Sequence, residues 1–152
     1  MTDRRKTLGD LGEQIAEELL RENGFKKIRN LNENHPNHRF ADFLAERDGR
    51  SYLISVKARN AYTQAGTLNS TYNIRKRTED VNELSARYQA EPAWLTIQIF
   101  TDTGCYNAYF GTIAELGPRF SVPMTETATA KYECLAKERF DPHIASDLSN
   151  QS

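Results

Sequence analysis

Two short, neighbouring segments hold side chains that could act together on a phosphodiester. They are Phe40-Ala41-Asp42-Phe43-Leu44 and Leu53-Ile54-Ser55-Val56-Lys57. A carboxylate such as Asp42 offers the oxygen ligands that Mg²⁺ prefers, and the Lys57 ammonium can steady an attacking water or the charge on a phosphate. Ser55 stands where a second carboxylate would complete a metal-nuclease site. The segments therefore predict metal-assisted hydrolysis with a weakly held metal.

The chain between these segments predicts a tight hairpin. Asp48-Gly49 lies between two apolar runs, and a type I′ turn needs the positive φ angles that this pair tolerates. Counting outward from a two-residue loop places Asp42 opposite Ser55, and Lys57 shares the strand face of Ser55. The three side chains are therefore expected to converge, whereas a bulge would shift the register by one residue.

The elements around the hairpin predict an α/β sandwich with a mixed sheet. An apolar stripe that includes Leu11, Ile15 and Leu19 indicates the first helix. Pro92 is expected to end the second helix, and Thr125 to cap the last one. Residues 59–77 show no regular period and are expected to form a long loop. The expected order is a helix over 7–23, strands over 25–30, 39–46 and 51–58, a helix over 79–89, strands over 93–100 and 105–113, and a helix over 126–139.

Glu13 is the best candidate for a further ligand from outside the hairpin. It lies at the margin of the apolar stripe of the first helix, which places it beside the sheet rather than fully in solvent. The alternative is an ordinary exposed glutamate like Glu17 and Glu18. Asp42 and Lys57 have a structural alternative too, as an ion pair in a half-buried sheet.

Together these residues resemble the PD-(D/E)XK nuclease superfamily, and within it the archaeal Holliday-junction resolvases and the restriction-endonuclease-like core. The pattern comprises Gly12-Glu13 on the leading helix, Gly24-Phe25 after it, Ala41-Asp42-Phe43, and Ile54-Ser55-Val56-Lys57-Ala58-Arg59. The resemblance covers about residues 7–113, with the elements in the right order. It implies an αβββαβ core.

The resemblance also implies a site that uses Mg²⁺ or Mn²⁺. Glu13, Asp42 and the main-chain carbonyl of Val56 would hold the metal, with Lys57 as the catalytic lysine. Ser55 departs from the pattern, because the family has Glu or Asp at this position, and this departure weakens metal binding and catalysis. Resolvases of this type work as two-fold dimers, and an apolar face on the 93–113 hairpin is the expected homodimer interface.

A cluster of basic residues after the lysine strand would attract a phosphate backbone. Its members are Arg59, Arg75, Lys76 and Arg77. The neighbouring Tyr62 and Tyr72 could stack on bases. DNA is the expected partner, with RNA as an open alternative. The other interpretation of the run is a solvated loop.

Two other sites receive little support. His35, His38 and His143 fit no standard zinc motif. A Ser55–Lys57 nucleophile for acyl transfer would need an uncharged lysine, whereas Asp42 beside it favours the charged form.

The bulk properties fit one domain over residues 1–152. The chain has 20 Lys and Arg against 21 Asp and Glu, so net charge makes no case for nucleic acid. No membrane span or signal peptide is expected. Cys105 and Cys134 make neither a disulfide framework nor a zinc site, so both are expected in the core, and the expected location is cytoplasmic.

Three functional hypotheses remain open. The first is a Mg²⁺-dependent nuclease that acts on DNA phosphodiesters with an altered or weakened metal site. The second is a catalytically inactive nucleic-acid-binding module of the same fold, and Ser55 motivates it. The third is a protein-interaction domain, which the balanced charge motivates.

Overall fold

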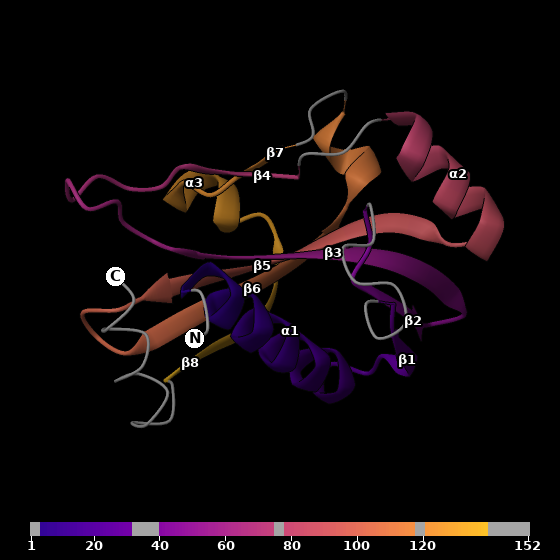
Figure 1. The fold of residues 1–152 in the computed structure, drawn as a ribbon, viewed down its shortest axis with the longest axis horizontal. Helices are drawn as coiled ribbons and strands as arrows, with labels where there is room; N and C mark the ends of the chain where they lie inside the picture. The colour runs from indigo at the N-terminus through magenta and orange to yellow at the C-terminus, as the bar shows by residue number, and fades with distance from the viewer. Residues whose placement is uncertain (1–3, 32–39, 75–77, 118–120, 140–152) are drawn as a thin grey trace.

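The computed structural model describes residues 4–31, 40–74, 78–117 and 121–139, with the backbone alone for 4–10 and 78. The described chain confirms the predicted order of helices and strands as far as the 105–113 strand, and it adds a strand, β4, before the second helix (Figure 1). The elements are α1 (Arg4–Glu22), β1 (Lys26–Asn30), β2 (Phe43–Arg47), β3 (Arg50–Asn60), β4 (Thr71–Asn73), α2 (Thr78–Tyr88), β5 (Glu91–Phe100), β6 (Cys105–Thr112), a 3₁₀ turn (Ile113–Leu116), β7 (Ser121–Pro123), α3 (Glu126–Thr129) and β8 (Glu133–Arg139).

A mixed six-stranded sheet with the order β1-β2-β3-β5-β6-β8 forms the centre of the molecule. β3 and β5 run parallel, and every other neighbouring pair in this sheet is antiparallel. α1 covers one face, where Leu19 and Leu20 pack against the sheet. α2 and the small β4–β7 sheet cover the other face, with Val81 and Tyr72 in a second core. The predicted α/β sandwich is confirmed.

The sheet curls far enough for the ends of two distant strands to meet. Arg47 of β2 donates two hydrogen bonds to Glu133 of β8, both at 2.7 Å. The Arg47 guanidinium also lies over the rings of Phe25 and Phe110, 4.3 and 5.4 Å from their centroids. The hydrogen bond to Glu133 raises the pKa of Arg47. This bidentate pair ties β2 to β8 around the core beneath α1.

The C-terminal prediction was wrong for most of its length. Thr125 does cap a helix, because its Oγ1 accepts a hydrogen bond from the Ala128 N–H at 3.2 Å. That helix, α3, ends at Thr129, and residues 133–139 form β8 against β6 instead. Leu135 is buried in the core beneath α1. Pairing with β6 and burial of one side chain outweigh local helix preference here.

Two further expectations about chain breaks also need correction. Pro92 lies inside β5, and α2 ends at Tyr88, followed by Gln89 in the left-handed region with a φ of 51°. The predicted loop over 59–77 contains the end of β3 and all of β4. β4 forms because Tyr72 and Ile74 are buried in the second core.

The expected homodimer face and the expected positions of the cysteines also differ from the structure. The 93–113 hairpin lies within the sheet with most of its side chains buried, so it offers no exposed apolar face. Cys134 is exposed and Cys105 is half-buried, so neither belongs to a core. None of the helices in the described ranges is both long enough and apolar enough to cross a membrane.

Candidate active site

The hairpin that carries the site has the predicted two-residue turn. Asp48 and Gly49 have φ angles of 53° and 78°, as a type I′ turn requires. Leu44 pairs with Leu53, as the outward count from this turn predicts. The paired ladder ends where Phe43 meets Ile54, one residue short of Asp42.

Asp42 is held at this end of β2 by three hydrogen bonds. Its N–H donates to the Ile54 carbonyl at 2.8 Å, and its carbonyl accepts from the Leu31 N–H at 2.9 Å. Its carboxylate Oδ2 accepts from the Val56 N–H at 2.7 Å. The side chain thus takes the place of a main-chain acceptor along the edge of β3. The expected direct pairing of Asp42 with Ser55 is not formed, because the regular ladder stops before it.

This hydrogen bond also sets the direction of the Val56 carbonyl. In an extended strand the N–H and C=O of one residue point to the same side of the strand. Since the Val56 N–H points at the Asp42 carboxylate, the Val56 carbonyl points toward the same region. Two oxygen groups that could bind a divalent cation therefore lie on the β2 side of β3, next to the end of the paired ladder.

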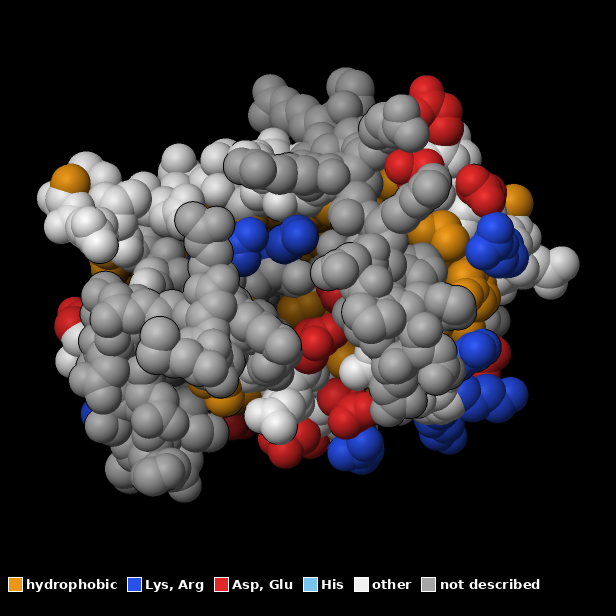
Figure 2. All heavy atoms as spheres, viewed as in Figure 1, with side chains coloured by type: hydrophobic (Ala, Val, Ile, Leu, Met, Phe, Trp, Pro, Cys, Tyr) orange, Lys and Arg blue, Asp and Glu red, His pale blue; other side chains and the backbone are white. Residues whose placement is uncertain are grey.

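Glu13 lies on α1, which packs against β3. A Cβ atom at Gly12 would lie 2.9 Å from the Ala58 Cβ, so the missing side chain lets α1 pack closely on β3 one residue from Lys57. Glu13 is half-buried and lines a cavity with Phe43, the residue that follows Asp42. Figure 2 shows acidic side chains gathered over α1 near the centre of the view, with basic side chains directly above them.

Sequence reasoning missed other residues that line the same cavity. Glu17 and Asn30 lie there with Glu13. The i,i+4 spacing of Glu13 and Glu17 could have signalled that both face one side of α1. Glu17 is also within 4.0 Å of Arg21, in an exposed pair.

Lys57 and Ser55 lie on the opposite face of the sheet from α1. Ser55 is 1% exposed and stands beside Trp94 of β5, and Lys57 stands beside Thr96. Within the described ranges, the Oγ of Ser55, the Oγ1 of Thr96 and the Nε1 of Trp94 are buried without hydrogen-bond partners. Buried polar atoms usually have hydrogen-bond partners. Burying these three polar atoms next to Lys57 without partners therefore costs folding free energy.

The oxygen donors that remain would suit a hard cation. Among the described residues, no three or more His, Cys, Asp or Glu side chains are grouped to hold a metal. Glu13, Asp42 and the Val56 carbonyl offer only oxygen, which fits Mg²⁺ or Mn²⁺ rather than zinc.

The predicted nucleic-acid contacts are only partly described. Arg59 is exposed, whereas Arg75, Lys76 and Arg77 lie outside the described residues, as do His35, His38 and His143. Tyr62 is 50% exposed, but Tyr72 is 1% exposed and cannot stack on a base. Burial raises the pKa of Tyr72, and its hydroxyl donates to the Arg59 carbonyl at 3.4 Å.

Comparison with known proteins identifies a similar fold. No protein-family model and none of the curated proteins matches the chain. A similar solved structure is that of Hjc from Archaeoglobus fulgidus, a Holliday junction resolvase from an archaeal hyperthermophile, with a TM-score of 0.54 and 14% identity. The match covers 92% of this chain and 98% of the resolvase. At this identity the likeness shows that the two proteins share a fold.

Proposed function

We propose that this protein is a Mg²⁺- or Mn²⁺-dependent nuclease that cleaves DNA phosphodiesters with a weakened metal site. The observation that carries the proposal is the hydrogen bond from the Val56 N–H to the Asp42 carboxylate, at 2.7 Å. It supports the proposal because it brings a carboxylate next to the main chain of Val56, on a fold shared with a Holliday junction resolvase.

In this proposal, each residue of the site has a separate role in metal binding or catalysis. Asp42 and the Val56 carbonyl would hold the metal, and Glu13 would add a ligand from α1, directly or through water. When bound, the metal supplies Lewis-acid chemistry that polarises the phosphoryl group and acidifies water. Lys57 would neutralise charge on the phosphate or orient the attacking water. Ser55, whose hydroxyl has no partner among the described residues, would hydrogen-bond a water in the site.

The substrate proposal follows from the fold and from the exposed cation beside the site. Because the similar structure is that of a Holliday junction resolvase, a four-way DNA junction is the first substrate to test, with a linear duplex of the same sequence beside it. Arg59, exposed near the end of β3, would contact the phosphate backbone.

Cleavage by substituted proteins tests the proposal. Asp42→Asn and Lys57→Ala should each lower cleavage of the junction in Mg²⁺ or Mn²⁺ by about 100-fold or more. Asp48→Asn, on the exposed turn of the same hairpin, and the exposed Lys131→Ala are matched controls that should retain activity. Full metal-dependent cleavage by either site variant would refute the proposed site.

Ser55→Glu provides a test that does not depend on cleavage. The substitution restores a carboxylate but buries it at a position that is 1% exposed. Without metal this carboxylate should destabilise the protein, and added Mn²⁺ should restore stability. The measurement is the thermal midpoint with and without Mn²⁺, compared with Ser51→Glu at the half-buried position nearer the turn. No gain with Mn²⁺ would count against a metal site at this position.

A catalytically inactive DNA-binding module on the same fold is the second candidate. It is favoured because no three or more His, Cys, Asp or Glu side chains are grouped to hold a metal among the described residues. It predicts binding that weakens as salt rises, with no hydrolysis in either metal. Metal-dependent cleavage that Asp42→Asn abolishes would exclude it.

A further inference from the structure

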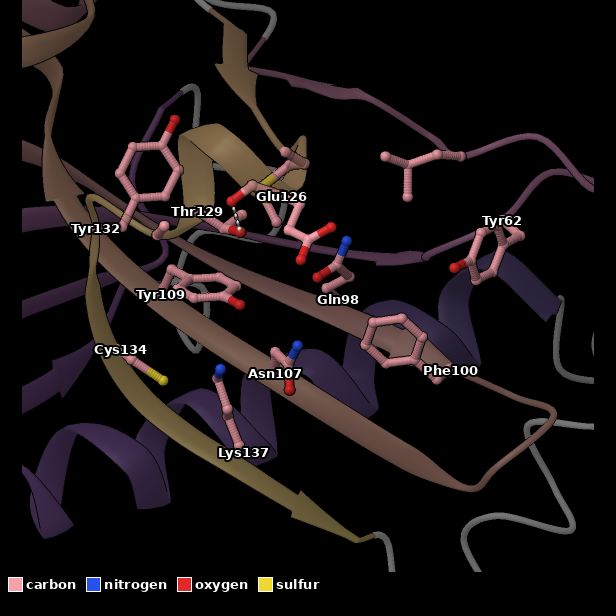
Figure 3. Close-up of a pocket in the computed structure, with 13 residues that line it drawn as sticks. Tyr62, Gln98, Phe100, Asn107, Tyr109, Glu126, Thr129, Tyr132, Cys134 and Lys137 are labelled. Atoms are coloured by element: carbon pink, nitrogen blue, oxygen red, sulfur yellow. Dashed lines mark hydrogen bonds between the residues drawn. The ribbon is translucent and has the colours of Figure 1, made fainter.

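Figure 3 shows a second cavity, which has a volume of about 550 Å³. It lies on the same face of the sheet as Lys57. Lys57 of β3 stands beside Thr96 of β5, and Thr96 stands beside Tyr109 of β6, which lines this cavity. Neighbouring strands are about 4.8 Å apart, so the cavity begins about 10 Å across the sheet from Lys57. We call it the β5–β6 pocket.

One wall of the β5–β6 pocket is a pair of side-chain amides. Gln98 and Asn107 stand opposite each other on β5 and β6, and Gln98 is only 5% exposed. No side-chain hydrogen bond joins either amide to another residue in the part of the chain that the structure describes. Figure 3 shows both amides facing the same space as the Tyr109 hydroxyl and the Lys137 ammonium. Both amides line the pocket and have donors and acceptors to offer, so this wall suits a ligand with donors and acceptors of its own.

The opposite end of the pocket is aromatic and open to solvent. Among the described residues, Tyr62 and Leu68 are the two large hydrophobic side chains that are exposed, at 50% and 37%, and both line the pocket. Tyr62 packs edge-on against Phe100, with ring centroids 6.2 Å apart. Such rings offer flat surfaces on which a planar ligand can stack.

We propose that the β5–β6 pocket takes one unpaired nucleobase of the DNA strand that passes Lys57. This inference rests on the proposed function and adds the part of the substrate that binds beside the cut. A base combines a flat face for Tyr62 with an edge of donors and acceptors for Gln98 and Asn107. The pocket volume is in the range of small-ligand sites.

The charged groups at the pocket favour a particular kind of base. Glu126 also lines it, and a carboxylate accepts a hydrogen bond from an exocyclic amine, which adenine and cytosine carry and thymine lacks. Lys137 can contact the phosphate that flanks the base. A base that is already unpaired costs least to bring into such a pocket, which links the pocket to branched or distorted DNA.

The test compares two DNA duplexes bound to the full-length Asp42→Asn protein, which should not cut them. One duplex is fully paired, and the other carries a single unpaired 2-aminopurine as a fluorescent adenine analogue. The unpaired base should tighten binding by about 5- to 100-fold and change its fluorescence, because stacking on aromatic side chains contributes on that scale.

Substitutions in the pocket should remove this preference without weakening binding to paired DNA. Gln98→Leu with Asn107→Leu keeps the volume and removes the amides, and Tyr62→Ala removes the stacking surface. Asn82→Leu, at an exposed amide of α2, is the matched control and should keep the full preference. Free adenosine monophosphate should compete only weakly with the duplex that carries the unpaired base, if the DNA strand is the source of the base. Strong competition, together with equal binding of the two duplexes, would overturn the proposal in favour of a free nucleotide.

The outcomes separate this inference from the proposed function. Equal binding of the two duplexes, or a preference that survives all pocket substitutions, would overturn the nucleobase pocket and leave the nuclease proposal standing. Failure of the unchanged protein to bind or cut any DNA would overturn both.

Discussion

The two faces of the main sheet hold different cores, as consecutive residues of β5 show. Leu95 and Ile97 point toward α1 into a core of apolar side chains. Thr96 and Gln98, which alternate with them, point to the other face and are buried there as polar groups. A strand that only had to fold would have apolar residues at both sets of positions, because burying a polar group without a partner costs free energy.

The difference between the faces favours the face opposite α1 for most of the proposed site. The polar face carries Ser55, Lys57 and the β5–β6 pocket, and the unpaired Thr96 hydroxyl lies between Lys57 and Tyr109. The face beneath α1 stabilises the fold and brings Glu13 toward the edge of β3. Features that lower stability, such as buried polar groups without partners, are most often found where a protein binds a ligand or catalyses a reaction. Four predictions test this division, in order of decreasing expected effect.

Leu95→Ala should be the most destabilising of these changes. Leu95 is 0% exposed in the core beneath α1, and truncating such a side chain typically costs about 2–5 kcal/mol because a cavity is left. Urea denaturation followed by circular dichroism gives the free energy of unfolding. A loss below about 1 kcal/mol would mean that this core collapses around the cavity and is less tightly packed than the structure indicates.

The two close-packed glycines should respond differently on the two faces. A Cβ at Gly111 would overlap the Trp94 indole, so Gly111→Ala should cost about 1–3 kcal/mol. Gly12→Ala presses on Ala58, but alanine favours the helix by up to about 1 kcal/mol, so its net cost should be smaller. Because Gly12→Ala pushes α1 off β3, it should lower cleavage more than stability. Unfolding and cleavage measured on the same samples separate these effects, and equal stability losses would contradict the comparison.

Arg47→Lys should destabilise the α1 face by about 1 kcal/mol. Lysine cannot form the bidentate pair of hydrogen bonds that Arg47 makes with Glu133. Partial exposure of the pair limits its contribution to stability. Arg87→Lys is the control, because its pair with Glu83 is 60% exposed on both sides and should contribute little. Chemical denaturation of both variants provides the comparison. Equal effects would show that the curl of the sheet does not depend on this pair.

Thr96→Val and Ser55→Ala should have the smallest effect on stability. Each removes a buried hydroxyl without a hydrogen-bond partner among the described residues, so the change should be neutral or stabilising by up to about 1 kcal/mol. Thermal and urea unfolding test this. A loss above about 2 kcal/mol would show that a buried water or other partner satisfies these hydroxyls.

Much of the fold follows from local patterns in the sequence. The Asp48-Gly49 turn fixes the hairpin register by backbone conformation alone, and the stripe of Leu11, Ile15 and Leu19 places α1. The C-terminal strand could not be read in the same way. Residues 133–139 become β8 because β6 offers them an edge and Leu135 finds a core, and both conditions exist only after the rest of the sheet has formed.

The candidate site shows the same limit. Its residue types and the order of its elements are evident from the spacing of Asp42, Ser55 and Lys57. The expected opposition of Asp42 and Ser55 failed because the ladder ends at Phe43, which alternation along a strand does not signal. The β5–β6 pocket was not foreseen, since Tyr62, Gln98 and Lys137 are far apart in the chain and meet only across three strands and a loop.

The sequence by itself determined the hairpin, the order of the main elements as far as the 105–113 strand, and the presence of an aspartate and a lysine with a serine where a carboxylate would stand. These features depend on neighbours a few residues apart, where turn conformation and side-chain alternation act directly. Only the tertiary structure decided that Asp42 reaches the Val56 N–H, that Ser55 is buried without a partner among the described residues, and that the polar face continues into a pocket. Those features depend on how far each strand extends and on which elements cover each face of the sheet. Contacts between distant parts of the chain determine both.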